Sequence, residues 1–144
     1  MSYLIDTCCI SELVKRKPNP RVVKWFEDVD ELTMYVSVIT FGELRKGIEK
    51  LPDSEMKEVL HRWVKEDLSN RFKNRILYVT LKEVNEWGKV LAKAEKNGTP
   101  VPAIDALIAA TAKVHDLRVV TRNTKDMKNC DVTLVNPWTY EPDA

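Results

Sequence analysis

The order of apolar and polar segments predicts an α/β protein, a three-layer α/β/α sandwich with a mostly parallel sheet. Short apolar runs, typical of buried strands, alternate along the chain with longer amphipathic segments. Strand candidates separated by helices are what parallel pairing requires. No internal repeat, low-complexity tract or linker divides the sequence, so we expect residues 1–144 to form a single domain.

Five short apolar runs are the strand candidates. They lie at residues 2–5, 34–39, 75–79, 118–121 and 132–136. Helical patterns fill the intervals at residues 9–17, from Asn19 onward with Pro20 in the first turn, at 41–50, at about 54–73, from Thr80 to Asn97, and at 102–112. Thr80 and Glu83 are spaced as a capping box, and Asn97-Gly98 is a helix stop signal.

The composition is that of a globular protein. Its residues are 44% hydrophobic and 31% charged, and 23 basic residues balance 22 acidic ones to leave a net charge of +1. Any contact with nucleic acid must therefore come from a local basic patch. The sequence shows no signal-peptide pattern, no membrane span, and no zinc or disulfide spacing among its three cysteines. We expect a cytoplasmic protein with reduced thiols and no membrane contact.

The stretch PAIDALIAATA, residues 102–112, places one carboxylate in an alanine-rich helix pattern. Helical spacing puts Ile104, Leu107 and Ile108 on a core stripe, and Asp105 on an adjacent face where the side chains stay small. A carboxylate at the start of such a helix needs a partner, and other segments supply candidates.

Acidic and amide side chains fall where a parallel sheet binds its ligands, beyond the carboxyl ends of the strands. Asp6 ends the first strand. We expect Glu43 and Asp105 in the first turns of their helices, while Asn123 and Asp126 follow the fourth strand. The sequence therefore predicts that these side chains gather at one edge of the sheet.

Each of these residues also has a purely structural interpretation. Glu43 could complete a capping box with Thr40, Asp105 could complement a helix dipole, and Asp126 could occupy a turn. Asp6 is harder to explain, because a carboxylate after a buried strand is costly unless it is paired. Several converging carboxylates repel one another unless a cation offsets their charge, and no lysine lies in the first turns beside them. Oxygen donors without a histidine cluster favour Mg²⁺, or Mn²⁺ as a substitute, over Zn²⁺.

Four segments resemble the ordered motifs of PIN-domain proteins, most of all the VapC-type and FitB-type toxins of prokaryotic toxin–antitoxin pairs. They are YLIDTCCISEL, SVITFGELRKGIEK, PAIDALIAATAKVHDLRVVTRNTKDM and LVNPW, within residues 3–138. The resemblance implies a PIN-like fold and a metal-dependent endoribonuclease that hydrolyses RNA and is usually a homodimer. It also implies a cognate antitoxin that lays a helix or tail across the toxin, with a basic side chain near the acids.

Mapped onto this sequence, the resemblance implies an acidic site of Asp6, Glu43 and Asp105, with its fourth corner at Asn123 or Asp126. Asp6 and Asp105 would be the principal ligands of Mg²⁺ or Mn²⁺. One or two such ions would polarise the scissile phosphate, lower the pKa of an attacking water and stabilise the leaving oxygen.

The sequence departs from the family pattern at two positions. Members commonly have asparagine where this chain has Cys8, and many have aspartate where it has Asn123. Cys8 affects the fine geometry of the site. Asn123 offers a weaker, neutral ligand, so a second ion would either bind poorly or rely on Asp126. Neither change removes the three central acids.

Two further residues are candidate contacts to RNA or phosphate. The Thr7 hydroxyl could bond a metal-bound water or a phosphate, or could be an ordinary cap hydroxyl. Arg122, beside the proposed fourth corner, is the preferred phosphate contact among several basic residues near the acidic edge.

Three other classes compete with an active ribonuclease. A catalytically weak or silent PIN-fold module that binds RNA or a partner is supported by Cys8 and Asn123. A receiver domain would need paired acids after the first strand, whereas Thr7 and Cys8 follow Asp6. Nucleases of structured DNA use extra elements for which so short a chain has no room.

Overall fold

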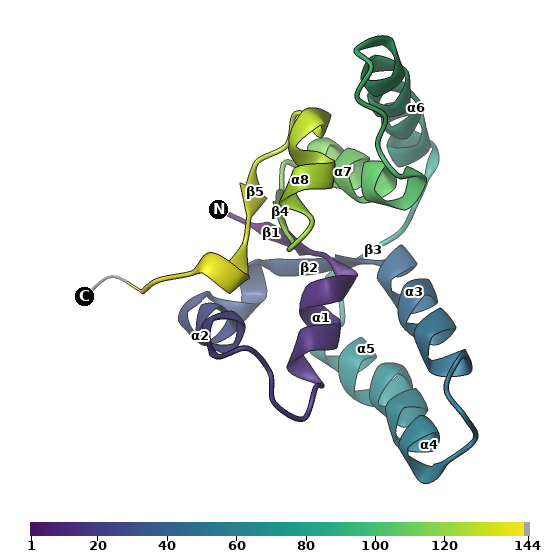
Figure 1. The fold of residues 1–144 in the computed structure, drawn as a ribbon, viewed down its shortest axis with the longest axis vertical. Helices are drawn as coiled ribbons and strands as arrows, with labels where there is room; N and C mark the ends of the chain where they lie inside the picture. The colour runs from purple at the N-terminus through teal and green to yellow at the C-terminus, as the bar shows by residue number, and fades with distance from the viewer. Residues whose placement is uncertain (143–144) are drawn as a thin grey trace.

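The computed structural model describes residues 1–142, and within them five parallel strands form one sheet in the order β3-β2-β1-β4-β5. The strands are β1 (Tyr3–Ile5), β2 (Met34–Ser37), β3 (Ile76–Leu77), β4 (Arg118–Val120) and β5 (Leu134–Val135). Helices cover both faces of this sheet (Figure 1). The predicted α/β architecture with parallel pairing is confirmed.

Helices connect the strands at nearly every predicted interval. They are α1 (Thr7–Leu13), α2 (Pro20–Asp28), α3 (Val38–Glu49), α4 (Glu55–Arg62), α5 (Ser69–Arg71), α6 (Leu81–Lys96), α7 (Ala103–His115) and α8 (Thr124–Met127). A π-helical segment, Trp63–Leu68, joins α4 to α5. The long helix predicted over residues 54–73 therefore has a widened middle. Short 3-10 turns lie at Glu31–Thr33, Lys128–Cys130 and Pro137–Thr139.

The alternation of side chains along the strands assigns the helices to faces of the sheet. Ile5 of β1 packs in the same cluster as Trp25 of α2 and Leu44 of α3. Leu4, its neighbour in the strand, packs with Ile108 of α7 on the opposite face. Successive strand residues point to opposite faces, so both must be apolar when both faces are covered. This explains why the strands appear in the sequence as continuous apolar runs.

Helix termini follow the predicted signals in part. Asn19 caps α2 by accepting from Arg21 N at 2.9 Å, and Gly98, with φ of 70°, follows the end of α6. At the start of α6 the Thr80 hydroxyl donates to Glu83 Oε2 at 2.7 Å, but Thr80 accepts no bond from the helix backbone. The capping box predicted there is therefore wrong: the two side chains bond each other and not the backbone N–H groups.

The predicted start of α3 is wrong. The helix begins at Val38, and the side chain of Ser37 caps it by accepting from Ile39 N at 3.1 Å. Thr40 is buried inside the helix, so it makes no capping box with Glu43, which lies in the second turn. Ser37 and Thr40 are both suitable N-cap residues, and the helix starts after Ser37, the last residue of β2.

The core stripe predicted on α7 is wrong at its first position. Ile108 is fully buried, but Ile104 is 42% exposed. The alanine face is instead the deeply buried one: Ala106, Ala109 and Ala110 pack with Val90 of α6. Small side chains let α6 and α7 approach closely, as Figure 1 shows for these adjacent helices.

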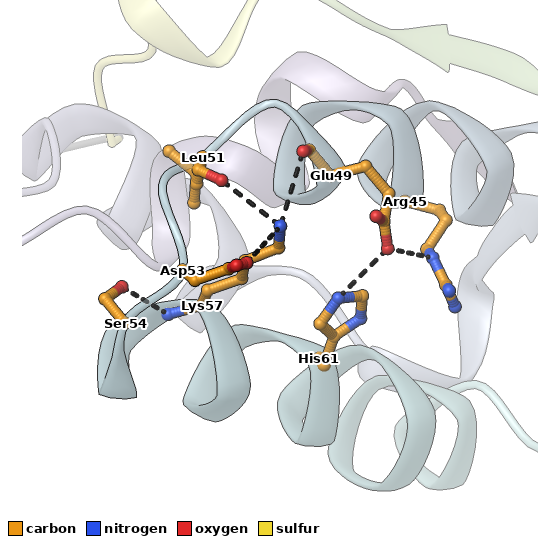
Figure 2. Close-up of polar contacts among 7 residues, drawn as sticks. All are labelled: Arg45, Glu49, Leu51, Asp53, Ser54, Lys57 and His61. Carbon is orange, nitrogen blue, oxygen red and sulfur yellow. Dashed lines mark hydrogen bonds and ion pairs between the residues drawn. The ribbon is translucent and has the colours of Figure 1, made fainter.

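Polar contacts hold α3 against α4 (Figure 2). Lys57 Nζ donates to the carbonyls of Glu49 and Leu51, at 3.4 and 3.2 Å, where α3 ends. The Glu49 carboxylate pairs with Arg45 at 2.9 Å and lies 3.2 Å from His61 Nε2. These contacts fix the far end of the helix that carries Glu43.

No helix within residues 1–142 has both the length and the apolar character needed to cross a membrane. Cys8, Cys9 and Cys130 are free thiols, in agreement with the cysteine spacing.

Candidate active site

Asp6 lies directly after β1 and has two structural functions. Its backbone N–H donates to the Val120 carbonyl of β4 at 2.9 Å, and its Oδ1 accepts from Thr7 N at 2.9 Å to cap α1. The side chain is only 4% exposed. Burial raises the pKa of Asp6, although hydrogen bonds from Thr121 and Thr7 oppose the rise.

Thr121 is a site residue that the sequence analysis missed. It follows β4 as Asp6 follows β1, and the parallel register pairs Ile5 with Val120, so the two residues lie level. The fully buried Thr121 hydroxyl donates to Asp6 Oδ2 at 2.7 Å and accepts from Asn123 N at 2.9 Å. What could have identified Thr121 is its position directly after β4, the strand that pairs with the strand ending at Asp6.

Glu43 faces the same edge from the second turn of α3. The Thr7 hydroxyl donates to Glu43 Oε1 at 2.6 Å and lies 3.0 Å from the Thr40 hydroxyl. Thr7 is therefore engaged with an acid of the site. This bond connects the start of α1 to α3. It is neither the phosphate contact nor the cap hydroxyl that the sequence suggested for Thr7.

Asp105 lies in the first turn of α7, as predicted. Burial, followed by the charges of Asp6, Asp126 and Glu43, raises the pKa of Asp105 to about 6. Three carboxylates from three other segments therefore act electrostatically on Asp105. The predicted gathering of acids at one sheet edge is present in the fold.

The two candidates for the fourth corner both lie at α8. Asn123 precedes this helix, is exposed, and bonds to Thr121 through its backbone N–H. Asp126 lies within α8, is also exposed, and contributes to the raised pKa of Asp105. Of the two candidates, only Asp126 adds a negative charge that acts on Asp105.

Cys8 occupies the space beside Asp6. Its Sγ lies 3.9 Å from Asp6 Oδ2 and 3.7 Å from the Thr121 hydroxyl, and it accepts from Arg122 N at 3.5 Å. The thiol thus bridges the ends of β1 and β4, where family members commonly have an amide.

The Arg122 side chain does not point to the acids. Its guanidinium lies over the Trp138 ring at 5.1 Å. The pKa of Glu12 is lowered mainly by its hydrogen bond with Lys15, and Arg122 adds to that effect. Arg122 therefore extends along α1, beside the acidic site and not within it.

The negative charge of the site has no protein counter-ion. Within residues 1–142, no lysine, arginine or histidine forms an ion pair with Asp6, Glu43, Asp105 or Asp126. In the same residues no three His, Cys, Asp or Glu side chains converge closely enough to form a ready metal site. Charges repel one another over longer distances than those at which side chains bind a common metal ion. The acids can therefore raise the pKa of Asp105 without lying close enough to form a ready metal site.

This donor set fits a hard divalent ion. Mg²⁺ typically takes one or two carboxylates and completes its octahedral shell with water and substrate phosphate. Asp6 and Asp105 supply such oxygens, whereas the site has no histidine and no closed cage of the kind that structural Zn²⁺ requires.

Comparison with known proteins agrees with this geometry. A family model described as PIN domain matches residues 3–131. The toxin FitB of Neisseria gonorrhoeae is 37% identical over 94% of this chain and 97% of its own length. The VapC ribonuclease Y4jK of Sinorhizobium fredii is 30% identical over 94% of this chain and 96% of its own.

Solved structures show the same fold. The FitAcB crystal structure from Neisseria gonorrhoeae superposes with a TM-score of 0.92 and 36% identity, over 96% of this chain and 99% of that one. The VapBC-1 structure from nontypeable Haemophilus influenzae gives 0.76 at 25% identity, over 97% and 100%. With its parallel sheet, its edge of uncompensated acids and these matches, the chain belongs to the PIN-domain family.

Proposed function

We propose that this protein is a metal-dependent endoribonuclease that hydrolyses RNA phosphodiester bonds and acts as the toxin of a toxin–antitoxin pair. The observation that carries the proposal is the set of carboxylates at the sheet edge, with which no basic side chain of residues 1–142 forms an ion pair. Burial, and after it the charges of the other acids, raises the pKa of Asp105 to about 6. The relatives named as VapC ribonucleases and FitB toxin support the reaction and the role.

The site residues take distinct parts in this proposal. Asp6 and Asp105 hold the Mg²⁺ ion, or Mn²⁺ in its place, with Glu43 beside them and Asp126 or Asn123 at the fourth corner. When bound, such an ion neutralises charge on the scissile phosphate and lowers the pKa of a water. Thr121 and Thr7 hold the carboxylates of Asp6 and Glu43 through the bonds described above.

A cognate antitoxin is the proposed protein partner, and we expect the toxin to form a homodimer. Solved relatives include toxin–antitoxin complexes, among them VapBC from Salmonella typhimurium bound to DNA. We propose that a basic side chain of the antitoxin reaches the acids. An arginine there would find unpaired carboxylates, and its charge would compete with the metal.

The test is cleavage of total cellular RNA by antitoxin-free protein with Mg²⁺, with Mn²⁺ and with EDTA. We expect discrete fragments with either metal and none with EDTA. Asp105→Asn and Asp6→Asn should abolish cleavage while circular dichroism and thermal melting show a folded chain. Lys96→Gln, an exposed change at the end of α6, is the matched control and should cut normally.

The second candidate is a catalytically weak or silent PIN-fold module that binds RNA or a partner. Cys8 and Asn123, the two departures in the site, favour it. Folded wild type that binds RNA but cuts none with either metal would establish this candidate, and metal-independent binding unchanged by Asp6→Asn would support it further. Restored cleavage in Cys8→Asn with Asn123→Asp would show that the two departures caused the silence.

A further inference from the structure

Arg122 carries a positive charge at the edge of the acidic site. Its backbone N–H donates to Cys8 Sγ at 3.5 Å, and the same sulfur lies 3.9 Å from Asp6 Oδ2. A guanidinium at the end of three methylene groups is long enough to reach past one sulfur atom. Yet within residues 1–142 Arg122 forms no ion pair with any acid.

The ring of Trp138 holds the guanidinium outside the site. The guanidinium carbon lies 5.1 Å from the ring centroid, which is within the range of a cation–π contact. A second attraction acts in the same direction. The pKa of Glu12 is lowered first by its hydrogen bond with Lys15, and the charge of Arg122 adds to the effect. Both contacts draw the charge of Arg122 along α1 and not toward the acids.

The position of Trp138 is fixed by the C-terminal turn. Asn136 Oδ1 accepts from Trp138 N at 2.9 Å, and the ring packs against the larger core cluster. The turn lies beside α2 (Figure 1), and after it the Tyr140 hydroxyl donates to Asp28 Oδ2 of α2 at 2.7 Å. The ring is therefore a rigid support for the arginine.

A guanidinium and a divalent ion compete for the same carboxylates. Pairs of arginine with carboxylate are among the strong charge-assisted hydrogen bonds. Asp126 is exposed and lies only four residues after Arg122, and Asp6 lies on the other side of Cys8. Without the ring, these unpaired carboxylates are the partners open to the guanidinium.

We propose that Trp138 is a positioning residue that holds Arg122 away from the acids and so keeps the metal site open. The inference rests on the proposed metal-dependent function. It extends that function by assigning control of metal affinity to a residue of the C-terminal turn, which touches none of the four acids through any hydrogen bond or ion pair within residues 1–142.

The test measures the Mn²⁺ affinity of antitoxin-free protein by isothermal titration. Trp138→Leu should bind Mn²⁺ about tenfold more weakly, the size of effect expected when a neighbour of the metal ligands is changed. Adding Arg122→Gln to Trp138→Leu should restore the affinity of the wild type, because the competing charge is gone. Trp138→Phe keeps an aromatic face for the guanidinium and should lose little.

Arg21→Gln is the matched control for the change of charge. Arg21 is exposed and contacts the Tyr140 carbonyl and the Glu141 carboxylate, in the segment that follows Trp138. Combined with Trp138→Leu, it also removes one positive charge, but the Mn²⁺ affinity should stay low. Damage to packing would persist in both double variants, so rescue by Arg122→Gln alone identifies the arginine as the competitor.

Nuclear magnetic resonance of the arginine side chains provides a second readout that needs no metal. In EDTA, the Arg122 Nε–H signal of Trp138→Leu should shift when Asp126→Asn is added, because the guanidinium then loses a partner. In the wild-type background, Asp126→Asn should leave this signal in place, since the guanidinium lies on the ring.

The outcomes separate this proposal from the proposed function. If the wild type binds Mn²⁺ and Trp138→Leu binds it equally well, the positioning role alone is overturned. An equal loss in Trp138→Leu and in both double variants also overturns it, because the tryptophan would then act through packing. A wild type that binds no Mn²⁺ overturns the metal site, and the Arg122 signal then decides. A response to Asp126→Asn only in Trp138→Leu keeps the positioning role, and no response overturns it.

Discussion

Two threonine hydroxyls hold the acids of this site. Thr121 donates to Asp6 and Thr7 donates to Glu43, at 2.7 and 2.6 Å. Hydrogen bonds of this kind fix the rotamer of a carboxylate and stabilise its charged form. The arrangement allows like-charged side chains to remain at one edge before any cation is present.

We expect Thr121→Val to weaken Mg²⁺ or Mn²⁺ binding by about tenfold or more, the usual effect of removing a partner of a metal ligand. Valine keeps the shape of threonine and removes the donor to Asp6 Oδ2. Isothermal titration with Mn²⁺ measures the loss, and Thr121→Ser should restore most of the affinity. Equal affinities in all three proteins would contradict a positioning role.

The raised pKa of Asp105 predicts how metal-free stability depends on pH. The native carboxyl titrates near pH 6 and the unfolded one near its ordinary value of 3.8, so between these values the native state holds more protons. The stability that Asp105 contributes is therefore lost as the pH rises from about 4 through 6.

Asp105→Asn lacks this charge, so in EDTA its melting temperature should exceed that of the wild type at pH 7.5. The gap should narrow as the pH falls toward 4. Thermal melting of both proteins across this range provides the test. A gap of the same size at every pH would mean that the asparagine acts through packing and not through removal of the charge.

Residue-level reasoning placed Asp6, Asp105 and Asp126 at one edge because strand ends and helix starts converge there in any parallel sheet. It missed Thr121, since nothing in the chain shows that the fourth strand in sequence lies beside the first. That adjacency depends on the strand order, which puts β4 next to β1. The orientation of Arg122 toward Trp138 is likewise a result of tertiary packing.

At the scale of elements, α3 shows how a local signal can be displaced. Ser37 and Thr40 are both good caps, and only tertiary structure selects between them. Ser37 pairs with Leu77 at the end of β2 and is nearly buried, so the chain must turn into the helix at that point. The boundary set there moves Glu43 from the first turn to the second.

Ser37→Ala should lower the free energy of unfolding by about 1 kcal/mol, the usual cost of losing a helix N-cap. The hydroxyl that accepts from Ile39 N is removed and little else changes. Urea denaturation measures the difference, and Ser37→Thr should recover part of it. If only variants of Thr40 lost stability, the cap would be Thr40, as the sequence suggested, and not Ser37.

At the scale of the whole molecule, the charge balance conceals a strong local asymmetry. The net charge is only +1. Yet within residues 1–142 the acids of the site form no ion pair, and neither do Lys46 and Lys50, which line an adjoining groove. Composition alone could exclude a cationic nucleic-acid binder. Only the fold brings the two kinds of charge next to each other.

Binding of a cation should therefore stabilise the whole fold. A ligand that binds only the native state adds about 2.7 kcal/mol when its concentration is about 100 times Kd. We expect Mn²⁺ to raise the melting temperature by several degrees at neutral pH and EDTA to reverse the rise. Asp6→Asn should show little response, while Lys96→Gln should respond as the wild type does.

The alanine face of α7 has a consequence for the genetics of this protein. Ala106, Ala109 and Ala110 are fully buried against α6, so a larger side chain at any of them would push apart two helices, one of which carries Asp105. A selection for cells that survive expression of the gene should therefore recover lesions at these alanines as well as at the acids. Mutations that abolish toxicity would then fall into two groups on the same helix, those that disturb packing against α6 and those that remove Asp105.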